Sequence, residues 1–399
     1  MKYLLPFRTT FIKNYKTHLY PMCLPFELDY DKRYHFITQK ENTYVDSLME
    51  KAYQKGVDPT VNAGEGEFGK SIQEGFEKVL DIILSKGEVH TMLEVGSGTG
   101  AFVKLLRDKG YDAEGVEPGK SLCNIAKEQY GISLHCGYLH EIYFRKKFDL
   151  VFAHGSIDHA RNPELLIKQM SDVAHKGSMM FFNVPDQSIP LEVGDPSMMV
   201  HQHRSYFTPE MAIGFLQKLG FSEVDCWKSP YYARYLYFWG KCPDHIKLPP
   251  TEKTENDNIQ MIPELYEKKV EKNLSYLQEV IDDTLSHKKS IGLYGAISYP
   301  FALLNWRGVY PRIFDTDQRK QGFYLPCNPS NKIEHPEKLV EKPVDQIWIQ
   351  AYKYDDDIRS YLKKLGIDAE IISYKDVFDI EGSTSFNKSD RSITCFSSS

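Results

Sequence analysis

The sequence has few cysteines and no long apolar run, and each shortage excludes a class of protein. Its seven cysteines are an odd number, and the closest two, Cys123 and Cys136, lie 13 residues apart. Neither a disulfide framework nor the paired-cysteine knuckle of a zinc site is therefore expected. No window approaches the roughly 18 apolar residues of a membrane span, and the two leucines before Pro6 are too few for a signal peptide. We expect a cytoplasmic protein with no membrane partner.

Positive charge is also in short supply. Lysine and arginine number 49 against 55 aspartates and glutamates, so the formal net charge is −6. A protein that grips a phosphate backbone broadly carries the opposite sign, so nucleic acid is not an expected partner. The 399 residues, 41% of them hydrophobic, suffice for two or three folded domains. The composition suits a globular enzyme that is a monomer or a homo-oligomer.

Strands and helices alternate along two stretches of the chain. Apolar strands at 91–95, 112–116, 148–153 and 178–184 are separated by segments of helical spacing. This alternation predicts an α/β fold with a doubly wound sheet, which a hairpin up to residue 240 should close in antiparallel fashion. A shorter alternation after residue 263 predicts a second, smaller α/β domain.

These patterns divide the chain into five parts. The predicted parts are an N-terminal segment (1–65), a cofactor-binding domain (66–242), a polar linker (243–262), a C-terminal α/β domain (263–379) and a mobile tail (380–399).

A glycine-rich loop follows the first strong strand. In LEVGSGTGAF, Gly96, Gly98 and Gly100 stand where a strand turns into a helix and a ligand approaches the backbone. Glycine spacing alone fits both S-adenosyl-L-methionine (SAM) and NAD. Glu94 favours SAM, because a carboxylate at this place repels a pyrophosphate and attracts the methionyl ammonium. Glu117, 21 residues past Gly96, ends the next strand and can accept hydrogen bonds from both ribose hydroxyls.

Two parts of the chain resemble known methyltransferases. Residues 91–183, with LEVGSGTG, Glu117 and FDLVFAHGSIDHARNP, resemble class I SAM-dependent methyltransferases. Residues 195–376 resemble the sugar methyltransferases that act on nucleotide-linked deoxysugars and are best known for C-methylation. DPSMMVHQHRSYF is similar to their YHEHxSYFS segment, and LYGA, LLNWRG, FDTDQRKQGFYLP and VDQIWIQAYKYDDDI follow in that family's order. The resemblance implies a SAM-binding domain, a second domain that closes over the acceptor, and a nucleotide-activated or other sugar as substrate.

The predicted cofactor-binding residues are Glu94, Gly96, Ser97, Gly98, Gly100, Glu117 and His154. We interpret His154 and Asp158 as loop and cofactor-edge residues rather than catalysts.

The chain departs from the resembled family in two places. That family begins with a four-cysteine zinc module, whereas only Cys23 precedes residue 123 here. The family's YHEH reads VHQH over residues 200–203, which removes a tyrosine hydroxyl and a glutamate carboxylate while keeping the second histidine, His203. Gln202, in place of the glutamate, cannot take a proton.

We predict that protein purified without added metal holds no stoichiometric zinc, because the four thiolates of the family's module are missing. Elemental analysis measures this directly. One zinc per chain would show that histidine and aspartate ligands had been misjudged, and His201 and His203, with Asp195, would be the first suspects.

His203 is the first candidate for catalysis. It lies between the fifth strand and the next helix, on the side where doubly wound sheets bind ligands, and imidazole suits proton abstraction at neutral pH. His159, after the fourth strand, is matched by a histidine in the resembled family and is the second candidate, with Gln202 as a positioning amide. In the second domain Asp315, Lys320 and Gln321 follow a strand end, and Lys320 could meet a diphosphate.

The residues favour one reaction and leave others open. C-methylation needs a carbon made acidic by a ketone and groups that hold the enolate, and two polar groups of that segment are absent. The sequence therefore favours O-methylation of a sugar hydroxyl, with His203 as general base. One alternative is C-methylation of a nucleotide-linked keto-deoxysugar. A second is an NAD-dependent sugar oxidoreductase, although no Tyr-x-x-x-Lys pair is well placed for it. A third is a partner subunit that binds SAM without catalysing methyl transfer.

Overall fold

The computed structural model describes residues 2–7, 12–13, 16, 21–55, 66–229, 235–246, 248 and 261–379. Contacts along the chain define two compact units. One combines Met1–Leu28, Ile189–His201 and Met261–Asn387, and the other combines Asp29–Ser188 with Gln202–Gln260 and Lys388–Ser399. We call them the smaller and the larger unit. Among the described helices, none is long and apolar enough to cross a membrane.

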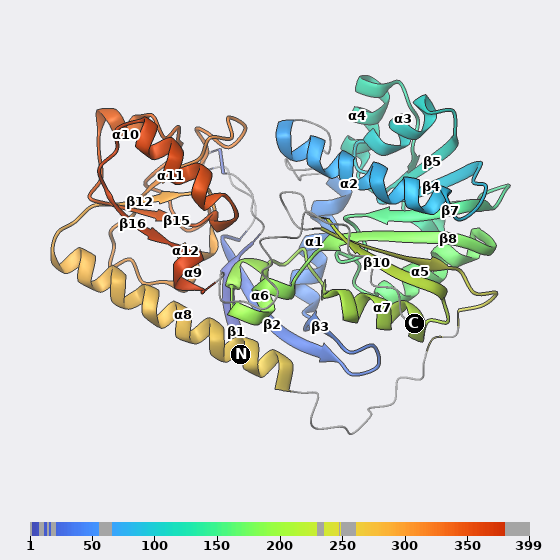
Figure 1. The fold of residues 1–399 in the computed structure, drawn as a ribbon, viewed down its shortest axis with the longest axis horizontal. Coiled ribbons are helices and arrows are strands. Elements are labelled where there is room, and N and C mark those ends of the chain that lie inside the picture. The colour runs from blue at the N-terminus through green and yellow to red at the C-terminus, as the bar shows by residue number, and fades with distance from the viewer. Residues whose placement is uncertain are drawn as a thin grey trace. The chain divides into compact units, whose positions relative to one another are not determined.

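A seven-stranded sheet forms the centre of the larger unit (Figure 1). Its strands, in the order β10-β11-β8-β7-β4-β5-β6, are β10 (Ser222–Lys228), β11 (Tyr235–Lys241), β8 (Ala174–Pro185), β7 (Phe148–His154), β4 (Thr91–Val95), β5 (Asp112–Glu117) and β6 (His135–Cys136). β4 pairs in parallel with β5 and β7, whereas β11 runs antiparallel to β8 and β10. The predicted doubly wound sheet and its closing antiparallel hairpin are confirmed.

Helices cover both faces of this sheet. They are α2 (Gly66–Leu84), α3 (Ala101–Asp108), α4 (Lys120–Tyr130), α5 (Pro163–Asp172) and α7 (Pro209–Lys218). The apolar residues of α2 recur every three or four positions, and Phe76, Val79 and Ile83 are fully buried against Phe152 and other side chains of one sheet face. Residues of α5 and α7 pack on the other face. The strand order changes direction between β4 and β7, where such sheets bind ligands at their carboxyl ends.

The chain before residue 66 is divided between the two units, which differs from the predicted single segment 1–65. In the smaller unit β1 (Lys2–Pro6) pairs antiparallel with the first half of β2 (Cys23–Asp31). In the larger unit β3 (Phe36–Gln39) pairs with β9 (Ser205–Tyr206), and α1 (Thr43–Lys55) follows. A short antiparallel pairing between distant segments has no local sequence signal, so periodicity could not reveal it.

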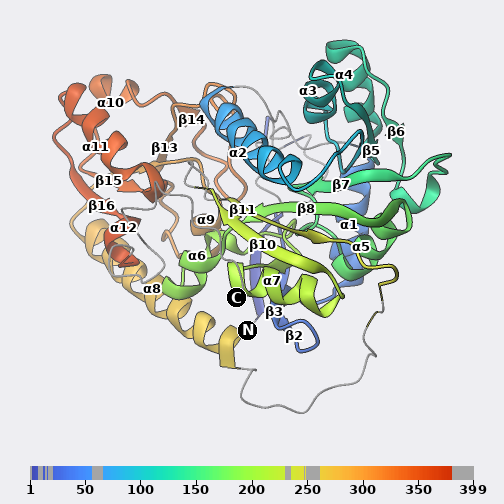
Figure 2. The same cartoon turned by 45° about the vertical axis from the view of Figure 1, so that its right-hand side comes forward.

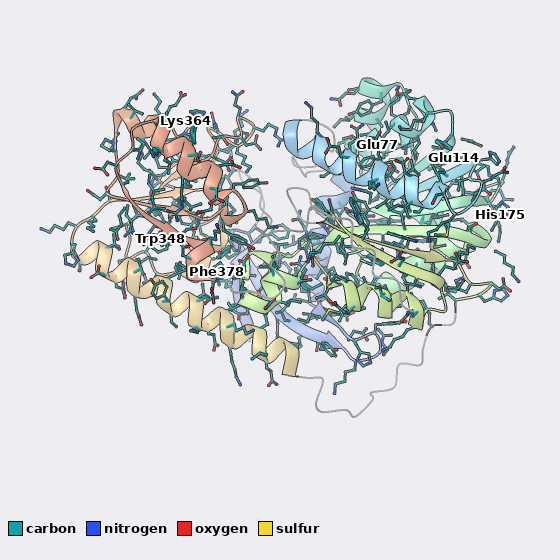
Figure 3. The ribbon with its side chains drawn as sticks, in the orientation of Figure 1. Glu77, Glu114, His175, Trp348, Lys364 and Phe378 are labelled. Atoms are coloured by element: carbon teal, nitrogen blue, oxygen red, sulfur yellow. The ribbon has the colours of Figure 1, made fainter. Side chains whose placement is uncertain are left out.

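The smaller unit contains a five-stranded parallel sheet, β14-β13-β12-β15-β16 (Figure 2). Its strands are β12 (Ile291–Tyr294), β13 (Arg312–Phe314), β14 (Ile333–Glu334), β15 (Gln346–Ile349) and β16 (Glu370–Ser373), and its helices are α8 (Met261–Ser286), α9 (Tyr299–Leu303), α10 (Lys338–Glu341), α11 (Asp355–Lys364) and α12 (Tyr374–Val377). Trp348 of β15, labelled in Figure 3, is fully buried in the core between this sheet and its helices. The predicted smaller α/β domain is confirmed.

Two further stretches bear on the predicted boundaries. α6 (Ser188–Val193) and the turn η3 (Pro196–Met198) were not predicted, and the segment that follows Ser188 joins the smaller unit. There the buried Asp195 accepts hydrogen bonds from Ser197 and from the hydroxyl of Tyr352. Most of the predicted linker, and all of the predicted mobile tail, lie outside the described residues.

Candidate functional site

The glycine loop lies at the carboxyl end of β4. Gly96, Gly98 and Gly100 have φ of 79°, 54° and 76°, in the left-handed region that side chains disfavour. A Cβ on Gly96 would lie 2.7 Å from the Cβ of Ser156, so the loop has no room for a larger residue there. The Ser156 hydroxyl donates to the Val95 carbonyl at 2.8 Å, which ties the loop after β7 to the loop after β4.

Two buried carboxylates flank the loop. Glu117 accepts hydrogen bonds from the backbone N–H of Gly98 and of Gly119, both at 2.8 Å, and burial raises its pKa to about 7. Each carboxylate oxygen keeps a second acceptor site for a ribose hydroxyl. Glu94 is 2% exposed, and its Oε2 has no hydrogen-bond partner among the described residues. Burial, and secondarily the charge of Glu117, raises the pKa of Glu94 well above its usual value.

These features fit SAM. The unsatisfied oxygen of Glu94 is where a cationic ammonium would relieve a buried negative charge, and Glu117 is held in place to receive a diol. The backbone of the glycine loop leaves space for a ligand close by.

Two of the predicted cofactor residues play supporting parts. The Ser97 hydroxyl donates to the Glu94 carbonyl at 3.0 Å and so stabilises the loop from inside. His154 ends β7 with its Nε2 3.1 Å from the hydroxyl of Tyr237, and the rings of Phe76 and Phe102 pack against it. These neighbours desolvate the imidazole and lower the pKa of His154 to about 3, so it is neutral.

The loop after β7 and the segment before β9 bring three functional groups together. The carboxylate of Asp158 lies 3.7 Å from Nε2 of His203 and 3.6 Å from Nε2 of His159. The two imidazole rings stack with their centroids 5.5 Å apart. Backbone bonds from Arg204 and Ser205 to the Asp158 carbonyl fix the two segments side by side. The histidines are partly exposed, at 21% for His203 and 30% for His159, so both can meet a substrate.

Asp158 is buried, and neither of its carboxylate oxygens accepts a hydrogen bond within the described part of the chain. Burial raises the pKa of Asp158 to about 6, and the His203 imidazole partly offsets this. A buried carboxylate of this kind needs a cation or a donor, and the two imidazoles are placed to supply it. From the sequence, Asp158 is predicted to be a loop and cofactor-edge residue. The signal that could have revealed it is its place next to His159.

Tyrosines surround this cluster. The ring of Tyr53, from α1, stacks on His159, and the ring of Tyr206, from β9, meets His203 edge-on. The buried hydroxyl of Tyr206 has no hydrogen-bond partner among the described residues. Tyr235, at the start of β11, faces the charge of Asp158, which together with the larger effect of burial raises the pKa of its phenol. Sequence reasoning missed Tyr53 and Tyr235, because they come from segments far from His203 in the chain.

The other predicted groups separate. His201 is fully buried in the smaller unit, packed by Phe7 and Phe26, with its Nε2 3.2 Å from the Pro25 carbonyl. His201 and His203 therefore have different surroundings, and the grouping of both with Asp195 is not seen. Gln202, between them, is buried in the larger unit.

At the carboxyl end of the sheet in the smaller unit, Asp315 follows β13. Its Oδ2 accepts hydrogen bonds from Ala296 N at 3.0 Å and from Lys320 Nζ at 2.8 Å, while Gln321 donates to its carbonyl. Gly295, with φ of 104°, makes the turn after β12. The strand order reverses between β12 and β15, so this edge is the expected ligand side of the smaller unit.

Comparisons with known proteins agree with this geometry. Residues 68–225 match the profile of a methyltransferase domain, and residues 251–370 match that of a C-methyltransferase C-terminal domain. The C-methyltransferase NovU of Streptomyces niveus is 23% identical over 310 residues, 72% of this chain and 73% of that protein. An uncharacterized methyltransferase of Staphylococcus carnosus is 28% identical over 114 residues, which cover 29% of this chain and about half of that relative (54%).

Solved methyltransferase structures are also similar. Magnesium protoporphyrin IX methyltransferase from Synechocystis PCC 6803 covers 51% of this chain with 99% of its own, at 12% identity and a TM-score of 0.39. The methyltransferase profile covers the central strands, the glycine loop, Glu94 and Glu117. The oxidoreductase alternative is therefore not supported. We conclude that residues 68–225 form a methyltransferase domain of the class I SAM-dependent kind and that SAM is its cofactor.

Proposed function

We propose that this protein methylates a carbon next to a ketone in a nucleotide-activated sugar. The observation that carries this proposal is the cluster of His203 with His159 and Asp158. The last two lie in the loop after β7, whose Ser156 donates a hydrogen bond to the Val95 carbonyl directly before the glycine loop. A proton on carbon is removed only by a well-placed base, and the cluster offers two imidazoles and a carboxylate. The C-terminal match to a C-methyltransferase domain supports carbon as the acceptor.

The residues of this chain perform the proton chemistry. When bound, SAM supplies an electrophilic methyl group on a sulfonium. His203 takes the proton from the acidic carbon, and the electron pair left on that carbon forms the new C–C bond as the methyl–sulfur bond breaks. His159, whose ring stacks on His203, donates a hydrogen bond to the developing enolate oxygen. The proton on His203 then leaves to solvent, which balances the step.

The smaller unit has a candidate anion-binding group of its own. Lys320, held by Asp315, is a cation at the ligand edge of the parallel sheet, and it is 29% exposed. Its ammonium can pair with a diphosphate. The Gly295 turn brings the backbone to the same edge.

O-methylation of a sugar hydroxyl, favoured by the sequence analysis, is the second candidate. Its basis is the loss of two polar groups over residues 200–203, which leaves Gln202 where the resembled family has a glutamate. The carboxylate of Asp158 lies 3.7 Å from Nε2 of His203 and comes from another segment, the loop after β7. His203 therefore has a carboxylate and a second imidazole beside it, and this supports carbon rather than oxygen as the acceptor.

A product analysis tests the proposal. The protein is incubated with labelled SAM and paired nucleotide sugars, each as the ketone and as the matching reduced alcohol. We expect label transfer to a keto-deoxysugar nucleotide, and NMR of the product should show a methyl on the carbon beside the ketone. In D2O, with S-adenosylhomocysteine in place of SAM, the same carbon should exchange its proton. A methyl on oxygen, without exchange, would establish O-methylation instead.

A further inference from the structure

The resembled family carries a glutamate directly before the catalytic-segment histidine, and this chain has Gln202 there. An amide cannot supply the negative charge that stabilises a protonated imidazole. The structure nevertheless contains a carboxylate beside His203, and it comes from a different loop.

That carboxylate belongs to Asp158, in the turn after β7. It is 1% exposed, its Oδ2 is 3.7 Å from Nε2 of His203, and neither oxygen has a hydrogen-bond partner among the described residues. The distance is longer than a hydrogen bond, but catalytic contacts often tighten only when the ligand binds. The carbonyl of Asp158 is fixed by the backbone N–H groups of Arg204 and Ser205, directly after His203.

We propose that Asp158 is the positioning residue for His203, and that it supplies, from the loop after β7, a carboxylate that residues 200–203 lack. This inference rests on the proposed function, because it assigns a role at the same site. The carboxylate orients the imidazole toward the substrate, and its charge favours the imidazolium that forms as His203 accepts the proton. Asp158 touches no reacting atom.

The groups around Asp158 make it suited to this role. His159 and His203 lie beside its carboxylate. Tyr206 faces it from β9 and Tyr235 from β11. Among these neighbours in the described chain, only the two imidazoles can become cations. The guanidinium of the nearby Arg204 is engaged by Gln39 and Asp46. The negative charge of Asp158 therefore acts mainly on the histidines.

The test uses Asp158→Asn, which keeps the size of the side chain and removes the charge. We expect kcat to fall by about 10² or more, with KM and S-adenosylhomocysteine affinity changed less than about twofold. The acidic limb of the kcat profile should move to lower pH by roughly one unit, because the carboxylate no longer favours the protonated imidazole. Adding Gln202→Glu to this variant should recover at least about tenfold of the lost rate.

A matched control is available on the same sheet. Glu114, labelled in Figure 3, holds Nε2 of His135 at 2.6 Å, a carboxylate–histidine pair outside the site. Glu114→Gln should leave kcat and the pH profile unchanged. Retained wild-type kcat in Asp158→Asn, or no recovery with Gln202→Glu, would overturn the proposal.

A measurement without substrate separates this inference from the proposed function. NMR titration of the imidazole protons, assigned with His159→Gln and His203→Gln, should show the His203 midpoint at lower pH in Asp158→Asn than in the wild type. If no nucleotide sugar is methylated but this shift is seen, the substrate assignment fails and the coupling of Asp158 to His203 stands. An unchanged midpoint would overturn the coupling. The three groups also offer ligand atoms within 4.8 Å of one another, so a stoichiometric metal lost in Asp158→Asn would make Asp158 a ligand and equally overturn the proposal.

Discussion

His203→Ala is expected to lower kcat by about 10² to 10⁴ while leaving the affinity for S-adenosylhomocysteine intact. The His203 imidazole lies beside Asp158 and the stacked ring of His159, and its side chain is 21% exposed. Without it the site loses the imidazole that we propose as the general base. Glu94 and Glu117, the predicted cofactor residues, lie on β4 and β5, so we expect cofactor affinity not to depend on His203. Steady-state kinetics and calorimetry of the same preparation measure both quantities.

His159→Ala and His201→Ala serve as the comparison variants. His159 shares the carboxylate and is the reserve base, so its loss should cost less than the loss of His203. His201 packs against Phe7 and Phe26 in the smaller unit, and its replacement should affect stability rather than the chemical step. If His203→Ala keeps near-wild-type turnover and His159→Ala does not, the base is His159. If neither variant loses rate, proximity alone carries the reaction and the assignment of a base is wrong.

The central sheet was accessible from sequence because its strands and helices bury apolar residues at regular intervals. Thr91–Val95 is predicted and observed with the same bounds, and α2 shows the helical spacing that its buried face requires. The glycine loop could also be predicted from the sequence, because three backbone positions in the left-handed region within five residues favour glycine. The antiparallel β11 followed from a connection too short for a crossover helix.

The catalytic surroundings were less accessible, because they depend on pairings between distant segments. β3 lies beside β9 only in the folded chain, and α1 follows it, which brings Tyr53 to His159. The charge of Asp158 matters for the site because the carboxylate is buried and lies beside His203, which is 45 residues later in the sequence. A local pattern records spacing along the chain, whereas desolvation and long-range contacts set the chemistry of these groups.

The second large effect is expected at the cofactor loop. Gly98→Val and Glu117→Ala should each weaken S-adenosylhomocysteine binding tenfold or more, about 1.4 kcal/mol. Gly98 has φ of 54°, which a β-branched side chain disfavours, and its N–H donates to Glu117. Valine there shifts the loop and breaks that bond. Alanine at 117 removes the acceptor of the ribose hydroxyls and leaves the N–H groups of Gly98 and Gly119 without their partner.

Calorimetry over a range of pH adds a signature that a general loss of stability would not produce. Burial raises the pKa of Glu117 to about 7, so the ionised fraction of this carboxylate increases as the pH rises from about 6 to 8. The ionised carboxylate is the better acceptor for two hydroxyls. Wild-type affinity should increase over that range, and Glu117→Ala should flatten the increase.

Gly110→Val is the matched control, because Gly110 has φ of 91° in a turn after α3 with open space around it. It carries comparable backbone strain away from the loop, so its affinity should stay within about twofold of wild type. Tight binding that survives Glu117→Ala, or binding of NAD in place of S-adenosylhomocysteine, would contradict the cofactor site described for this sheet.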